Sequence, residues 1–240
     1  MRWNEFFQSE WVDCFIAGLP AGCLLKMSID DLRTIVRSSR DDAIGFNATA
    51  EVCLIGLVSH FEAFCKNQFA SVVNLCPQTL TAFCERRPDA QVRIADLLEV
   101  GFDTDGRIGS LLAEGYDFGS PKAINSLYCD LLRVTPFSVE EARKYERLLE
   151  DRNLLVHHAG IYTLRYHRQR LGRETVLSKA FMGSLEVRRR HFALWAGFLE
   201  RTAIKVIGAS HRAVVEFVER ERIRMPKARR DVLECLRWYE

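Results

Sequence analysis

The sequence predicts an all-α protein whose helices form a bundle. Apolar residues recur at spacings of three and four over most of the 240 residues, which is the pattern of helices with one buried face. Capping residues, glycines and prolines separate these periodic segments. Runs that are typical of strands are confined to one short part of the chain, between residues 161 and 180.

Residues 1–44 predict a helical extension that precedes the main domain. A first helix is expected over 3–17, and a Leu-Pro-Ala-Gly sequence at 19–22 predicts a turn after it. A second helix is expected over 28–41, because a serine and an aspartate at its start have the spacing of a capping box.

The main domain is expected over residues 45–207. Its most periodic helix is predicted over 47–74, where apolar side chains follow one helical face and a proline comes after the end. Five further segments are expected in this order: helices over 78–86 and 89–99, a Gly- and Asp-rich loop with one helical turn over 101–121, and helices over 121–132 and 138–159.

The chain changes character after residue 160. The runs at 161–169 and 174–180 flank a turn around Gly172 and predict either a short β-hairpin or an ordered loop. Three helices are then expected, over 185–207, 211–223 and 227–239, and the last two form a C-terminal helical tail over 208–240.

Composition limits the class of protein. No apolar run approaches the roughly 18 residues of a membrane span, and the first residues do not resemble a signal peptide. We therefore expect a cytoplasmic protein with no membrane partner. The eight cysteines form no C-x-x-C pair and no cluster with histidine at zinc-ligand spacing, so we expect reduced thiols, no metal and no cofactor.

Charge is unevenly distributed along the chain. Residues 1–142 contain 12 Lys and Arg against 20 Asp and Glu, whereas residues 143–240 contain 22 against 12. The second part therefore predicts either a basic surface for a polyanion such as RNA or a set of solvated helix faces.

The stretch DRNLLVHHAG, residues 151–160, interrupts an apolar stripe. Arg152 falls at the centre of this stripe, and Asn153 and His157 lie one turn apart at its edge. A guanidinium keeps its charge at physiological pH, so this face must meet negative charge or hydrogen-bond acceptors. The apolar residues of the stripe are Ala142, Tyr145, Leu148, Leu149, Leu155 and Val156.

Three interpretations of this polar cluster are open. Arg152 pairs with a core carboxylate such as Glu62, which interrupts an apolar helix face in the same way. Alternatively, His157 or His158 is an ordinary histidine whose hydrogen bonds are satisfied locally. In the third, Arg152, Asn153 and His157 form a site for phosphate chemistry, in which arginine stabilises charge on phosphoryl oxygens and histidine transfers protons.

The motif has the form of a known family. The run from Arg152 to His157, RNLLVH, resembles the R-x4–6-H motif of the HEPN superfamily, with a polar residue directly after the arginine. The longer stretch ERLLEDRNLLVHHAGIY resembles the RN-x-x-V-H-x-x-G form of bacterial HEPN-like proteins. The flanking helices resemble a HEPN-type bundle over residues 45–207.

This resemblance implies a metal-independent endoribonuclease that acts as a homodimer, with two motif helices facing each other across one composite site. It implies that Arg152 holds the scissile phosphate, that His157 is the general acid or base, and that Asn153 orients either of them. Glu62 and His158 are expected in supporting roles. The resemblance also implies a toxin, antiphage or stress-response setting with a neutralising antitoxin or operon partner. Its alternative is a non-enzymatic HEPN-type module that binds nucleotide or RNA, or scaffolds a partner.

Basic residues after the motif are expected to extend the RNA site. They alternate with Tyr162, Tyr166 and His167, which suits contacts to the RNA backbone together with base stacking. The alternative is a solvated loop and a charged helix start. The arginines are Arg165, Arg168, Arg170, Arg173, Arg188, Arg189 and Arg190.

Overall fold

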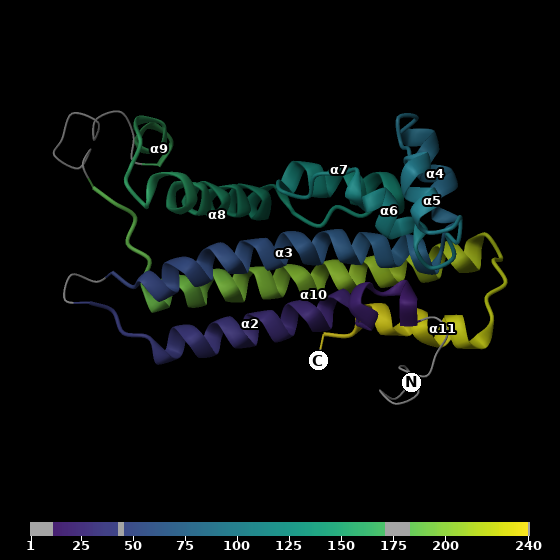
Figure 1. Cartoon of the computed structure of the whole chain (residues 1–240), viewed down its shortest axis with the longest axis horizontal. Helices are drawn as coiled ribbons and strands as arrows, with labels where there is room; N and C mark the ends of the chain where they lie inside the picture. Colours follow the sequence, from purple (N-terminus) through teal and green to yellow (C-terminus); the bar gives the residue numbers. More distant parts are fainter. Residues whose placement is uncertain (1–11, 43–45, 171–182, 240) are drawn as a thin grey trace. The chain divides into compact units, whose positions relative to one another are not determined.

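The computed structural model describes residues 12–42, 46–170 and 183–239, and these residues form helices without any extended strand (Figure 1). The prediction of an all-α protein is therefore confirmed. The chain divides into two compact units. Unit 1 comprises Met1–Met27, Phe61–Ser138 and Glu200–Glu240, and unit 2 comprises Ser28–His60 and Val139–Leu199.

The predicted turn at 19–22 is instead the beginning of helix α2 (Ala21–Ser38). The amides of Cys23 and Leu24 donate to the carbonyl of Pro20, at 3.0 and 3.2 Å. A proline is favourable at this place because the first residues of a helix need no amide hydrogen. Ser28, predicted as a cap, lies inside α2.

Two short 3-10 helices precede α2, where the sequence predicted the end of an α-helix. They are η1 (Val12–Cys14) and η2 (Ile16–Gly18), and Ala17 inside η2 has a left-handed backbone with φ of 58°. The first part of the predicted helix, over 3–11, lies outside the described residues.

Helix α3 (Ala48–Leu75) confirms the strongest helix prediction. Asn47 caps it, because its side-chain Oδ1 accepts the amide hydrogen of Ala50 at 2.9 Å. Of the described helices, α3 alone is long and apolar enough to span a membrane, a property that it shares with core helices of globular proteins. Its fully buried apolar side chains include Leu57, Val58, Phe61, Cys65, Phe69, Val72 and Val73.

Unit 1 is organised around the aromatic ring of Phe69. The rings of Phe83, Phe118 and Tyr128 meet it edge to face, with centroid distances of 5.7, 5.6 and 6.0 Å.

The predicted helices at 78–86 and 121–132 are confirmed, and the helix predicted at 89–99 is shorter. The loop predicted at 101–121 contains two helical turns. These helices are α4 (Thr79–Arg86), α5 (Ile94–Glu99), α6 (Ile108–Glu114) and α7 (Pro121–Leu132).

Helix α8 (Val139–His158) carries the motif and confirms the helix predicted at 138–159. It ends where Ala159 and Gly160 adopt left-handed backbones, with φ of 49° and 77°. The amide of Gly160 donates back to the carbonyl of Leu154 at 3.1 Å, which closes the last turn.

The predicted β-hairpin after the motif is wrong over its described part. Residues 164–170 form helix α9 (Leu164–Arg170), and the 174–180 run lies outside the described residues. Tyr166 and Arg170 both bind the carboxylate of Asp151. In a helix, residues four apart lie one turn apart on the same face and can reach the same group. In a strand, the same two residues would be separated by about 13 Å. Among the described residues, the two sides of the segment meet at an isolated antiparallel bridge, Ile161 to Ser184.

The two helices predicted at 185–207 and 211–223 are one helix, α10 (Arg189–Arg220). Ser210 donates its hydroxyl to the carbonyl of Val206 at 2.7 Å, so it is accommodated within the helix. The predicted boundary between the main domain and the tail, at 207/208, therefore falls inside α10. The last predicted helix corresponds to α11 (Lys227–Glu234) and the 3-10 turn η5 (Cys235–Arg237).

The cysteines are thiols. None of the eight forms a disulfide, and six of them are buried, as the sequence predicted for most. Burial raises the pKa of Cys14 and Cys23 to about 11, which makes these thiols poor nucleophiles.

Gly109 of α6 lies directly against α3, and a methyl group there has no room. A Cβ at this position would stand 2.2 Å from the carbonyl oxygen of Ala70, and the amide of Gly109 donates to Asn74 Oδ1 at 2.7 Å. We expect Gly109→Ala to lower the free energy of unfolding by about 1–3 kcal/mol, the usual cost of overpacking. Urea unfolding measures this. Gly115→Ala is the control, because its nearest atom is 3.5 Å away; equal stability of both variants would contradict the close approach.

Candidate functional site

The R-x4-H motif lies in the last two turns of α8, at the border between its buried and exposed faces. Arg152 is half-buried, and its Nε atom is shielded from solvent. Asn153 and His157 are exposed and lie one turn apart. Arg152 is therefore anchored in the protein, while the amide and the imidazole face outward.

The buried face of α8 differs from the predicted stripe. Val156 was expected on the stripe but is 47% exposed, and it joins Asn153 and His157 on the outer surface. An apolar side chain thus lies beside the two polar motif residues. The buried residues are Tyr145, Leu148, Leu149, Asp151, Leu154 and Leu155.

A buried carboxylate directly precedes the motif. Asp151 is 5% exposed, and its Oδ1 accepts two hydrogen bonds from α9, from the hydroxyl of Tyr166 and from Nη2 of Arg170, both at 2.8 Å. The Arg170 guanidinium also lies 5.7 Å from the centre of the Tyr166 ring. Through this cluster α9 is tied to α8 at the residue next to Arg152. Asp151 was not among the predicted site residues, although its position beside the motif arginine was a signal.

Burial dominates the electrostatics of this cluster. It raises the pKa of Asp151, and the nearby Arg170 and the hydrogen bonds from Tyr166 and Arg170 offset part of that effect. Burial likewise raises the pKa of the Tyr166 phenol, and the Asp151 charge adds to it. The Tyr166 hydroxyl therefore stays protonated and serves as a donor to the carboxylate.

Two of the three rings predicted to stack on RNA bases are inaccessible. Tyr166 and His167 are 7% and 0% exposed. Tyr162 is half-buried and stacks on Tyr166 with a centroid distance of 5.1 Å and an interplanar angle of 9°. Its ring also meets His167 edge-on at 5.4 Å. Burial therefore leaves the rings of Tyr166 and His167 no room to stack on RNA bases, while a contact of Tyr162 with RNA stays a prediction.

The predicted RNA-binding arginines divide into two groups, and Arg173 lies outside the described residues. Those in the first group are exposed and make no ion pair with any described residue; they are Arg165, Arg168 and Arg190. Those in the second group form ion pairs: Arg170 with Asp151, Arg188 with Glu186 at 2.7 Å, and Arg189 with Asp41 at 3.8 Å.

The predicted supporting residues differ in their surroundings. Glu62 is half-buried on α3, where its charge contributes to raising the pKa of Cys65 behind the larger effect of burial. His158 is exposed in the last turn of α8. The pairing of Arg152 with Glu62 stays a prediction. Across the described ranges, no three His, Cys, Asp or Glu side chains are grouped as a metal site would require.

No family model matches the chain, and no curated protein or solved structure matches it. The HEPN resemblance therefore rests on the motif and its helical setting.

The raised pKa of Asp151 predicts a pH-dependent contribution to stability. The folded protein holds the Asp151 proton more tightly than the unfolded chain does. The resulting stabilisation is complete below the ordinary pKa of 3.8 and is lost as the pH rises through the raised value. In Asp151→Asn the amide oxygen still accepts hydrogen bonds, but the charge is absent.

We therefore expect the unfolding free energy of the wild type, relative to Asp151→Asn, to decrease between about pH 3 and pH 7. Urea unfolding at several pH values measures this difference. A difference that increases with pH would show that the ion pair with Arg170 outweighs burial.

Proposed function

We propose that this chain is a metal-independent endoribonuclease that acts as a homodimer, with Arg152, Asn153 and His157 in the active site. The observation that carries the proposal is the placement of these residues on α8, with a half-buried arginine beside an exposed amide and imidazole. An anchored guanidinium next to an accessible imidazole suits the binding and cleavage of a phosphodiester.

The proposed reaction uses the ribose as its own nucleophile. The 2′-oxygen loses its proton and bonds to the phosphorus, while the bond from phosphorus to the 5′-oxygen breaks and that oxygen gains a proton. His157 transfers protons, Arg152 stabilises the charge on the non-bridging oxygens, and Asn153 orients the imidazole or the phosphate. The products are a 2′,3′-cyclic phosphate and a 5′-hydroxyl, so DNA, which lacks the 2′-hydroxyl, is not a substrate.

Two copies of the chain suit this reaction better than one. The entering and leaving oxygens lie on opposite sides of the phosphorus, so one imidazole cannot serve both at once. A second copy supplies another His157. The exposed Val156 supports an interface at this face, as do the exposed apolar side chains of Ile161 and Leu164 just after the motif.

A non-catalytic nucleotide- or RNA-binding module is the second candidate. Arg165, Arg168 and Arg190, which are exposed and form no ion pair within the described residues, favour it, because they can bind phosphates without any help from His157. Incubation of the purified protein with varied RNAs in EDTA separates the two functions. A ribonuclease of the proposed type cleaves under these conditions, and a binding module leaves the RNA intact.

Substitutions at the motif separate chemistry from folding. We expect His157→Ala to reduce the cleavage rate by about 10²–10⁴, the usual contribution of a proton-transfer group, with little change in melting temperature because the side chain is exposed. Arg152→Ala should abolish cleavage and also lower the melting temperature, because this side chain is half-buried. Cleavage of labelled RNA and thermal melts measure both effects.

His158→Ala is the matched control, since it removes a neighbouring exposed imidazole from the same helical turn. It should retain most of the activity. Loss of cleavage in His158→Ala together with full activity in His157→Ala would show that His158, and not His157, transfers the protons.

The dimer predicts a specific effect at Val156. The wild type should be a dimer at micromolar concentration, and Val156→Asp should be monomeric and inactive because it places a charge in the interface. Val139→Asp is the control: this valine is also exposed on α8, at 69%, but lies at the opposite end of the helix. Light scattering measures the mass. A monomeric wild type that cleaves RNA, or equal dimerisation of both variants, would refute the proposed interface.

A further inference from the structure

Unit 2 contains an arginine-lined pocket of about 330 Å³ between the C-terminal part of α2 and the first turn of α10. Its apolar lining includes Val36 and Phe192, both almost completely buried. None of the described lining residues is acidic, and none belongs to the R-x4-H motif. The lining residues are Arg33, Val36, Arg37, Arg189, Arg190, Phe192 and Ala193.

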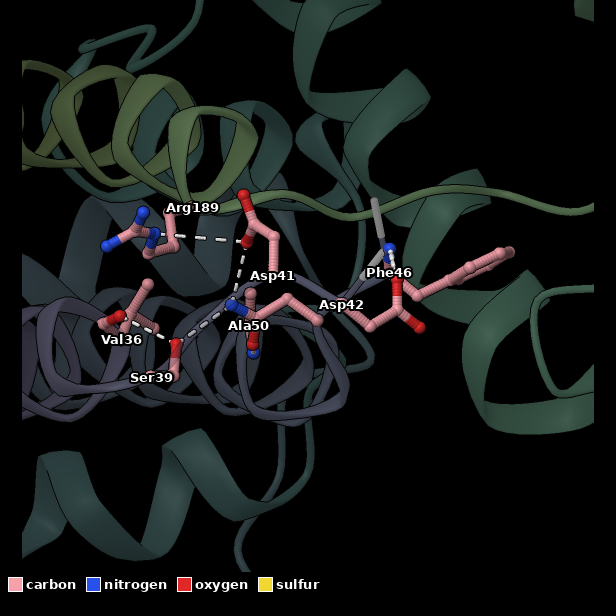
Figure 2. A network of polar contacts seen from close by, with 8 residues as sticks. Val36, Ser39, Asp41, Asp42, Phe46, Ala50 and Arg189 are labelled. Carbon is pink, nitrogen blue, oxygen red and sulfur yellow. Dashed lines mark hydrogen bonds and ion pairs between the residues drawn. The ribbon is translucent and has the colours of Figure 1, made fainter. Parts of the chain in front are cut away.

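A polar network joins the two walls of this pocket (Figure 2). The buried amide of Asn47 donates to Ser39 Oγ at 2.8 Å and to Asp41 Oδ1 at 2.9 Å. Ser39 in turn donates to the carbonyl of Val36 at 2.7 Å, and Asp41 pairs with Arg189 at 3.8 Å. The hydrogen bond from Asn47, followed by the nearby Arg189 and Arg188, lowers the pKa of Asp41. The end of α2, the cap of α3 and the start of α10 are thus held together.

The positive charge of the pocket is only partly balanced. Arg33 lies 3.5 Å from Asp30, whose side chain is largely exposed, and Arg189 has the long contact to Asp41. Arg37 and Arg190 are exposed and make no ion pair with the described part of the chain. The first turn of α10 contains no acidic residue, although a helix begins with the positive end of its dipole. An anion in the pocket would relieve this accumulation of charge.

We propose that this pocket binds the phosphate group of a nucleotide. Guanidinium groups match phosphate oxygens in geometry and charge, and four of them face one space here. The apolar surface of Val36, Phe192 and Ala193 suits an attached sugar or base, and the volume is that of a small-ligand site. A free mononucleotide and a residue of an RNA strand present the same chemistry. The inference does not depend on catalysis at His157.

Binding to the full-length protein tests the pocket. The probes are adenosine 5′-monophosphate, adenosine, and a labelled single-stranded RNA. The pocket variant is Arg37→Gln/Arg190→Gln. The matched control, Arg201→Gln/Arg224→Gln, removes the same charge from two exposed arginines outside the pocket. Thermal melts of both variants check folding. Titration calorimetry with the monophosphate and fluorescence anisotropy with the RNA give the affinities.

We expect the pocket variant to bind at least one phosphate-bearing probe about tenfold more weakly than the wild type, because two charge-assisted contacts are lost, while the control variant matches the wild type. Adenosine should bind to none of the three proteins. If the RNA strand is the occupant, the slope of log affinity against log salt should fall by about 1.4 for the two lost phosphate contacts. A loss confined to the monophosphate identifies a free nucleotide.

Equal affinities of the pocket and control variants for both phosphate probes would overturn the proposal. It would also be overturned if neither phosphate probe bound to the wild type. RNA cleavage by the wild type and by His157→Ala is measured separately. Failure of the pocket is therefore distinguishable from failure of the ribonuclease proposal.

Discussion

The burial of one face of α8 is the constraint on which the candidate site depends. Tyr145, Leu148 and Leu155 are inside the protein, and each such side chain contributes about 1.5–3 kcal/mol when it is removed from water. A rotation of α8 by one residue would expose several of them at once. The helix therefore has one orientation, and that orientation leaves His157 facing outward and Arg152 at the border. Apolar packing, and not polar contacts of the motif itself, determines where the chemical groups point.

The long periodic helices were predictable from the sequence, but several helix boundaries were not. The helix α3 was predicted because its apolar periodicity ends at a proline, and α8 was predicted because its apolar periodicity follows a capping box. The Leu-Pro-Ala-Gly sequence read as a turn, but a proline fits equally well at the start of a helix. The small residues at 208–210 read as a break, yet small side chains cost a helix only about 1 kcal/mol or less each, and tertiary packing exceeds that. The helix at 164–170 makes contacts to Asp151, and local helix propensity does not predict such contacts.

The sequence indicated which residues carry charge but not which charges are already engaged. Arg165 and Arg170 look alike in the sequence, yet one is exposed and the other is bound to a buried carboxylate. The partner of Arg170 precedes the motif by one residue and was not predicted, because the helix that brings the two together was not predicted either. In the same way, Arg33 and Arg37 are far from Arg189 along the chain, and only the fold places the four arginines of the pocket around one space.

Three helices pass from one compact unit into the other: α2, α3 and α10 each have one end in unit 1 and the other in unit 2. The two units are therefore compact regions of one chain and not exchangeable modules. A gene fragment that encodes either unit alone would have to cut through all three helices. Transfer of the motif to another protein would carry only part of α2, α3 and α10 unless both units were transferred together.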